Sequence, residues 1–163
     1  MAMIAEQVEV TLGAFARARA HSAALESKLG GLEMARAPHT EIEALVDAQG
    51  REWARLMFEE HMALRAAAER RVEVRGADGV DRRSARDSGR QLETLVGRVD
   101  VPRLAYQAPG SEDLHLLDAS LKLPCELFSH GIRRMVAKEV ARASFDEGGR
   151  STLRRDPDIS TLL

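Results

Sequence analysis

The sequence predicts an α+β fold: a long helical hairpin, then a small antiparallel β-sheet, then a C-terminal pair of helices. Apolar residues recur at helical spacing up to residue 70 and alternate with polar ones from residue 71 onward. A helical stripe returns after Pro124. The predicted segments are a helical arm (1–70), a sheet with its loop (71–124), a helix-turn-helix-like pair (125–155) and a flexible tail (156–163).

The arm is predicted to contain two antiparallel helices, over 1–29 and 40–70. The first carries apolar residues at helical spacing and is followed by Gly30-Gly31, a helix stop signal. The second carries an apolar stripe with Trp53 near its middle, and we expect Trp53 to be buried against the first helix. The same stripe would allow a homodimer through the 40–70 helix, although polar residues interrupt its heptads. The two interpretations can coexist.

Alternating residues predict three or four antiparallel strands between 71 and 124. The first two form a hairpin around Asp78-Gly79, a dipeptide typical of type I′ turns. A polar run follows, broken at Ser88-Gly89, and a later strand reaches Gly97, which permits a bulge or a tight bend. Pro102 has no N–H to donate, so it places this strand at a sheet edge or ends its pairing.

Two helices are predicted after Pro124. Ser129 is a good N-cap for the first, whose apolar residues are Ile132, Met135, Val136 and Val140. Ser144 and Glu147 have the spacing of a capping box and predict the start of the second. Two short helices joined by a tight turn, with basic outer faces, have the outline of a helix-turn-helix. An ordinary helical hairpin shares that outline.

The charge is distributed unevenly along the chain. The formal net charge is −2, but residues 1–60 carry six Lys or Arg against ten Asp or Glu, and residues 130–155 carry seven against three. A phosphate-facing surface is therefore expected in the C-terminal part. The predicted DNA-binding residues are Arg133, Arg134, Lys138, Arg142, Arg150, Arg154 and Arg155. Four earlier arginines could extend this DNA-binding surface: Arg82, Arg83, Arg86 and Arg90.

The sequence contains no group of residues typical of a catalytic, metal or cofactor site. Cys125 is alone, which excludes an internal disulfide and a cysteine zinc site, and we expect it to be a buried small apolar residue. The five histidines are scattered, and there is neither a phosphate-binding glycine loop nor a nucleophile elbow. We expect no enzyme activity and no cofactor.

No apolar run approaches the roughly 20 residues that a membrane span requires. The first residues do not have the basic start and apolar stretch of a signal peptide. The sequence thus predicts a soluble, cytoplasmic protein without a membrane partner.

Five sequence words follow one another between residues 71 and 147. They are VEV and GADG (72–79), TLVGRVDVPR with Tyr106 (94–106), LDASLKLP (117–124), SHGIRR (129–134) and VAKEVARASFDE (136–147). Their order and spacing resemble the N-terminal region of ISKra-type insertion-sequence transposases. The resemblance covers about half of the chain closely and the upstream helices more loosely.

Transposases of this kind cut DNA with three carboxylates that hold two Mg²⁺ ions on a ribonuclease-H-like fold. That fold needs βαβ crossovers, and the sequence lacks their alternation. Some relatives carry a cysteine pair after the tyrosine that Tyr106 matches, but residues 107–110 read QAPG here, so the zinc knuckle is absent. The resemblance therefore implies a truncated N-terminal region that binds duplex DNA at transposon ends, or assembles the transposase, without cutting.

Two other functions remain open. The chain could be a helical module that dimerises or binds a protein and never contacts DNA, or it could be a decayed fragment without activity. Salt-dependent binding to duplex DNA separates the first proposal from the protein-interaction module. A cooperative melting transition separates both from a decayed fragment.

Overall fold

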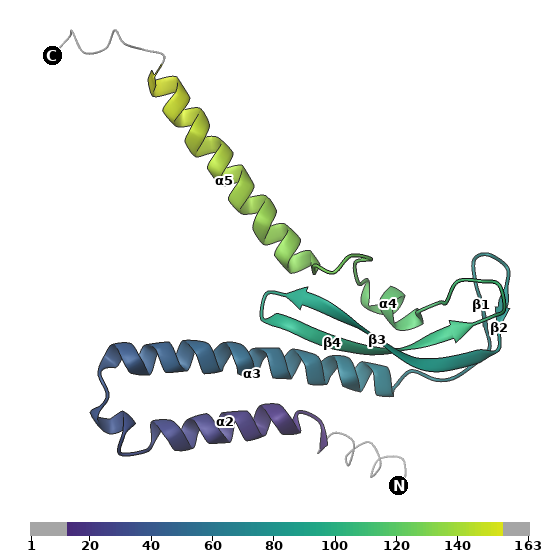
Figure 1. The fold of residues 1–163 in the computed structure, drawn as a ribbon, viewed down its shortest axis with the longest axis horizontal. Coiled ribbons are helices and arrows are strands. Elements are labelled where there is room, and N and C mark those ends of the chain that lie inside the picture. Colours follow the sequence, from purple (N-terminus) through teal and green to yellow (C-terminus); the bar gives the residue numbers. More distant parts are fainter. Residues whose placement is uncertain (1–12, 155–163) are drawn as a thin grey trace.

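The structure, a computed structural model, describes residues 13–154 and confirms the α+β class (Figure 1). Its helices are α2 (Ala16–Leu29), α3 (His39–Ala67), α4 (Leu116–Leu121) and α5 (His130–Arg154), and a 3₁₀ turn, η1 (Met34–Arg36), lies between α2 and α3. Its strands are β1 (Val74–Arg75), β2 (Asp81–Arg82), β3 (Ser84–Thr94) and β4 (Gly97–Gln107).

Helices α2 and α3 form the predicted hairpin (Figure 1). Within the predicted first helix, α2 begins only after Phe15, whose φ of 61° is not helical; residues 1–12 lie outside the described part. The carboxylate of Glu60 on α3 accepts hydrogen bonds from the backbone N–H groups of Arg17 and Ala18 at 3.0 and 3.1 Å. These donors lie in the first turn of α2, where a helix has no acceptors of its own. Glu60 therefore caps α2 from the neighbouring helix.

The prediction that Trp53 is buried against the first helix is wrong. Its side chain is 42% exposed, and that of Val46, seven residues earlier on the same face, is 44% exposed. One side of α3 packs on α2 and another packs on β4. Leu56 of α3 is buried, but no described element covers Trp53 to the same extent. The apolar periodicity of the sequence located the stripe on α3 but did not show which part of it the neighbouring elements cover.

Strands β3 and β4 form an antiparallel ribbon, and β1 and β2 form a separate two-stranded sheet, so the single sheet of three or four strands was wrong. The polar run before Gln91 belongs to β3, because one long partner strand supplies its hydrogen bonds. The tight bend at Gly97 is confirmed: Thr94 pairs with Gly97 across a two-residue turn, and Gly97 has a φ of 112°. Only glycine adopts such an angle without strain.

The outer edge of β4 lies along α3. The backbone N–H of Asp100 donates to Glu59 at 3.1 Å, and that of Leu104 donates to Glu69 at 2.9 Å. Pro102 lies between these two donors and has no N–H, so nothing on this edge is left unpaired there. The predicted edge position of Pro102 is confirmed, although β4 stays paired as far as Gln107. Acidic side chains of a helix thus replace the missing neighbour strand.

The main core joins the ribbon to α3. Leu92, Val99 and Val101 are buried there together with Met62 of α3. Other apolar residues pack around them: Phe58, Leu121 and Leu123. Helix α4 lies over the ribbon in Figure 1 and buries Leu117. The same core therefore holds both the helical arm and the C-terminal segment on the ribbon.

The hairpin predicted at Asp78-Gly79 is present, with Val74 paired to Arg82 and Arg75 to Asp81. The turn is not type I′, because a type I′ turn needs a positive φ at both central residues, and Asp78 does not have one while Gly79 does. Asp78 instead accepts from the backbone N–H of Val80 at 3.1 Å and from the guanidinium of Arg82 at 2.8 and 3.1 Å. The side chain of Asp78 closes the turn from within.

Acid should weaken this turn. The Arg82 guanidinium, helped by the N–H of Val80, lowers the pKa of Asp78 to about 2. A carboxyl group whose pKa is lowered on folding stabilises the fold above its unfolded pKa of about 4, and the contribution is lost as the pH falls toward about 2. Thermal melts should therefore show that Asp78→Asn is less stable than the parent at neutral pH and that the gap in Tm closes with acid. A gap that is independent of pH would contradict this assignment.

The C-terminal helix pair is instead one helix: α5 runs from His130 to Arg154 without a turn. Ser129 caps it as predicted, since its Oγ accepts from the backbone N–H of Ile132 at 3.3 Å. The spacing of Ser144 and Glu147 also occurs inside helices and does not end one, and no Gly or Pro lies between residues 132 and 147. The pair Gly148-Gly149 costs about 1 kcal/mol per residue, which weakens the helix without stopping it.

Candidate nucleic-acid interface on helix α5

The start of α5 is fixed to the ribbon. The backbone N–H of Glu93 donates to Leu127 at 2.8 Å, and that of Ser129 donates back to Glu93 at 2.9 Å. The segment before α5 thus adds a short parallel bridge to the end of β3. Gly131 lies against Leu95, since a Cβ on Gly131 would come within 3.0 Å of that side chain. From this root α5 extends away from the other elements (Figure 1).

Three of the predicted DNA-binding residues form a row along α5. Arg134, Lys138 and Arg142 follow one another at intervals of four residues, so they lie on one side of the helix over about 12 Å. Arg142 pairs with Glu139 at 3.0 Å. Arg134 and Lys138 are exposed, and neither has a hydrogen bond or ion pair to any residue in 13–142. They are the cations of the row that are available to an anionic partner.

The remaining predicted residues differ from this row. Arg133 makes two hydrogen bonds to the carboxylate of Glu126, at 3.0 and 3.1 Å. The backbone N–H of Glu126 and the nearby Arg133 lower the pKa of this carboxyl group, so the pair stays charged. Arg150 and Arg154 belong to the part of α5 whose side chains are not described, and Arg155 lies outside the described residues.

The extension of the basic row by four upstream arginines is wrong for Arg82 and Arg90, which the fold holds, and stays a prediction for Arg83 and Arg86, which are 79% and 57% exposed. Arg82 is 1% exposed and donates to Asp78 and to the carbonyl oxygen of Glu112, so it is a structural residue. Arg90 donates to the carbonyl oxygens of Pro124 and Glu126 at 2.8 and 2.6 Å, and it holds the segment that leads into α5. The other two are paired with acids: Arg83 with Glu73, and Arg86 with Asp113. Sequence could not show these partners, which lie 4 to 36 residues away.

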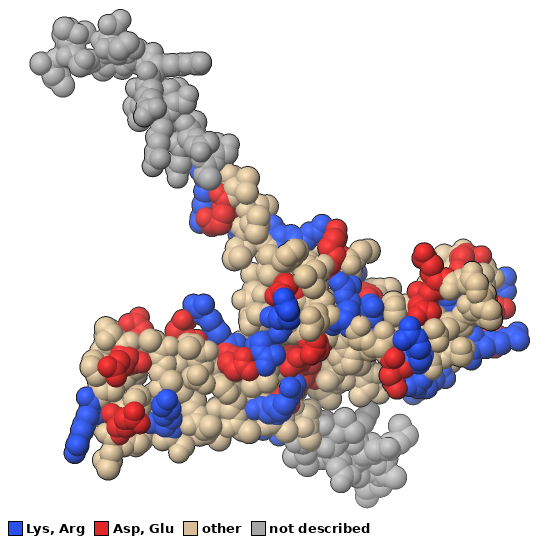
Figure 2. Space-filling model, viewed as in Figure 1, with Lys and Arg blue, Asp and Glu red and all other residues tan. Residues whose placement is uncertain are grey.

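Figure 2 shows the same pairing across the face turned to the viewer, where basic and acidic side chains alternate over the helical arm and the ribbon. This body carries no broad basic patch on that face. On this face of the molecule, the candidate surface for phosphate is therefore α5.

An apolar stripe accompanies the basic row on α5. Met135, Val136 and Val140 are 50%, 51% and 64% exposed, and Ile132 begins the stripe nearer the root. At these spacings Ile132, Val136 and Val140 lie on the side of the helix turned away from Lys138, whereas Met135, three residues before Lys138, borders the basic row. Helix α5 thus presents two different surfaces to its surroundings.

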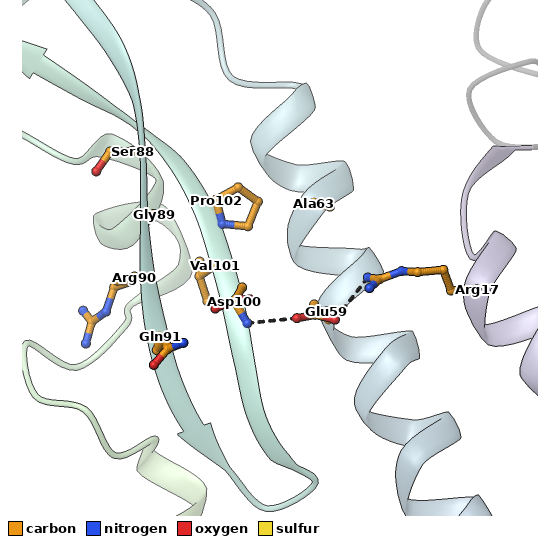
Figure 3. A pocket seen from close by; sticks show the side chains of 10 residues that line it. All are labelled: Arg17, Glu59, Ala63, Ser88, Gly89, Arg90, Gln91, Asp100, Val101 and Pro102. Atoms are coloured by element: carbon orange, nitrogen blue, oxygen red, sulfur yellow. Dashed lines mark hydrogen bonds and ion pairs between the residues drawn. The ribbon is translucent and has the colours of Figure 1, made fainter.

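A cavity of about 590 Å³ lies between the helical arm and the ribbon (Figure 3). Glu59 is its main charged group, and this carboxylate already binds Arg17 at 3.1 Å and the N–H of Asp100 at 3.1 Å. The side chain of Arg90 points away from α3 in Figure 3. Arg17, Glu59 and Arg90 thus serve the fold, whereas the exposed carboxylate of Asp100, which also lines the cavity, has no hydrogen bond or ion pair to the described residues.

Residues 13–154 contain no group of three His, Cys, Asp or Glu side chains that could hold a metal ion. Cys125 is free and exposed, so the prediction that it is buried is wrong. Its carbonyl accepts from Arg90 at 3.3 Å, which keeps this segment at the surface of the ribbon.

No family model matches the sequence, and no match was found among curated proteins or solved structures. Among the described helices, none combines the length and the apolar character needed to cross a membrane.

Proposed function

We propose that this chain is a non-catalytic module that binds duplex DNA through α5, as the N-terminal region of an ISKra-type transposase. The observation that carries the proposal is the pair Arg134 and Lys138, which project from an extended helix without an acid partner in the described part of the chain. The resemblance of the sequence words supplies the reason for DNA as the partner. One basic helix can enter the major groove without a second helix, as the basic regions of zipper proteins do.

Binding by phosphate contacts should depend steeply on salt. Each contact contributes about 0.9 to the slope of log affinity against log salt concentration. Arg134→Ala with Lys138→Ala should therefore weaken binding to every duplex and reduce the slope by about 1.8. Fluorescence anisotropy of labelled duplex DNA at several salt concentrations measures both quantities.

The matched control is Lys28→Ala with Arg36→Ala, which removes the same charge from the helical arm. Because neither residue lies on α5, this variant should keep the slope of the parent. Equal salt slopes for the two double variants would contradict the assignment of DNA binding to α5. If the folded protein does not bind DNA at low salt, the DNA function itself is contradicted. Incubation of the complex with Mg²⁺ should leave the DNA uncut.

A second candidate function is protein interaction, and the exposed stripe Met135, Val136 and Val140 favours it. Nucleic-acid phosphates offer nothing apolar to cover such a stripe. The two functions use different sides of α5 and do not exclude each other.

A further inference from the structure

Helix α3 has an open face made of Val46, Gly50 and Trp53, which follow one another at helical spacing. Val46 and Trp53 are both more than two-fifths exposed. A Cβ built on Gly50 would meet no atom within 4 Å, so space remains above the helix backbone at the centre of this face. Glycine inside a helix is unfavourable unless close approach requires it. The open face is therefore suited to another helix that packs closely.

In the apolar stripe of α5 (Ile132, Met135, Val136 and Val140), the last three side chains are at least half exposed, so no described residue covers them. Isolated helices are marginal in water and gain most of their stability from packing one apolar face. In Figure 1, α5 leaves its root in a direction away from α3. The described part of the chain therefore supplies no partner that covers the stripe.

The two surfaces match in length. The stripe of α5 runs from residue 132 to 140, or about 12 Å, and the open face of α3 from residue 46 to 53, or about 10 Å.

They are also opposite in charge. Residues 39–54 of α3 contain four acids and one arginine, a net charge of −3. Residues 130–142 of α5 contain four basic residues and one glutamate, a net charge of +3. Glu43 and Asp47 flank the open face, while Arg133 and Arg142 flank the stripe. Complementary charges of this kind fix partner and register at an interface.

We propose that two copies of this chain form a two-fold dimer in which the apolar stripe of α5 of each copy docks on the open face of α3 of the other. Each copy supplies α5 to one contact and α3 to the other. The assembly therefore stops at two copies and has closed symmetry. It identifies the partner of the homodimer expected through residues 40–70 as α5 rather than a second α3. Arg134 and Lys138 stay free on the far side of α5, so the dimer does not depend on DNA.

Trp53 provides a direct readout, because it is the only tryptophan in the chain. Docking of α5 would bury its half-exposed ring, so its emission should shift to the blue as the concentration of DNA-free protein rises. Sedimentation at the same concentrations should show the mass of a dimer. A protein that remains monomeric throughout, with unchanged emission, would overturn the proposal.

Charge reversal distinguishes this arrangement from other dimers. Arg133→Glu with Arg142→Glu, or Glu43→Lys with Asp47→Lys, should each weaken the dimer at least about tenfold, because like charges then face each other. A chain that carries all four changes faces opposite charges again at both contacts, so its dimer should be restored. All four residues are exposed, and circular dichroism confirms that the variants are folded.

A matched control, Arg75→Glu with Arg83→Glu, makes the same charge change on the β1–β2 hairpin and should leave the dimer intact. If the α5 variant loses the dimer but the fourfold variant does not regain it, α5 pairs with something other than α3 and the proposal fails. Since these measurements contain no DNA, this failure is distinct from a failure of the DNA function.

Discussion

Leu92→Ala is expected to lower the free energy of unfolding by about 2–5 kcal/mol. Leu92 is 2% exposed and packs with Val99, Val101 and Met62 in the main core. Removal of its side chain leaves a cavity between the ribbon and α3, which close packing prevents from collapsing fully. Urea unfolding monitored by circular dichroism measures the loss as a lower midpoint.

Leu95→Ala is the matched control, because it makes the same change three residues later in the same hairpin. Leu95 is 63% exposed at the ribbon turn, so the expected loss is below about 0.5 kcal/mol, apart from its contact with Gly131. If the two variants unfold at the same urea concentration, the core is not the one described above that joins the ribbon to α3.

Glu59→Ala is expected to destabilise the fold by about 2–3 kcal/mol, because its carboxylate joins three elements. It accepts from the N–H of Asp100 on β4, and it pairs with Arg17 of α2 and Arg55 of α3, each at 3.1 Å. Burial raises the pKa of Glu59, but the N–H of Asp100 and the two guanidiniums outweigh it and lower the pKa overall. The side chain is therefore charged at neutral pH while it is largely buried.

The comparison for Glu59 is Glu43→Ala on the same helix. Glu43 is exposed and contacts only His39, at 3.5 Å, so its loss should change the stability by less than about 0.5 kcal/mol. Thermal and urea unfolding of both variants check the difference. Equal stabilities would mean that the carboxylate of Glu59 does not hold the ribbon on the arm.

Features set by neighbouring residues could be predicted from the sequence. Ser129 caps α5, Gly97 makes the tight ribbon turn, and Pro102 lies at an edge, because each depends on the backbone within a few residues. The long helix and the α+β class follow from apolar periodicity over many residues.

Features that depend on distant partners could not be predicted. Trp53 and Leu56 belong to the same stripe, and only the packing of α3 on its neighbours α2 and β4 shows that Leu56 is buried and Trp53 is exposed. Strand β3 is too polar to be recognised without its partner β4. Helix α5 continues where a helix start was expected, since a capping spacing does not compel a break.

The candidate site divides in the same way. The net positive charge of the C-terminal segment indicated α5, and Arg134 and Lys138 lie free on it. The sequence could not show that Arg133 is held by Glu126 or that Arg82 is buried around Asp78. Only the folded chain separates an arginine that supports the structure from one that can bind a partner.

The two edges of the ribbon have different consequences for solubility. The carboxylates of Glu59 on α3 and of Glu69 just after α3 accept from the N–H groups of Asp100 and Leu104, so this stretch of β4 cannot template the growth of a sheet. Along β3, no backbone hydrogen bond joins residues 87–91 to any described segment other than β4. A second copy of the chain that approaches this edge would meet the exposed carboxylate of Asp87 and the exposed backbone of Gly89, which offer little apolar surface. The polar residues of β3 make this strand hard to recognise in the sequence, and the same residues keep its uncovered edge from aggregating.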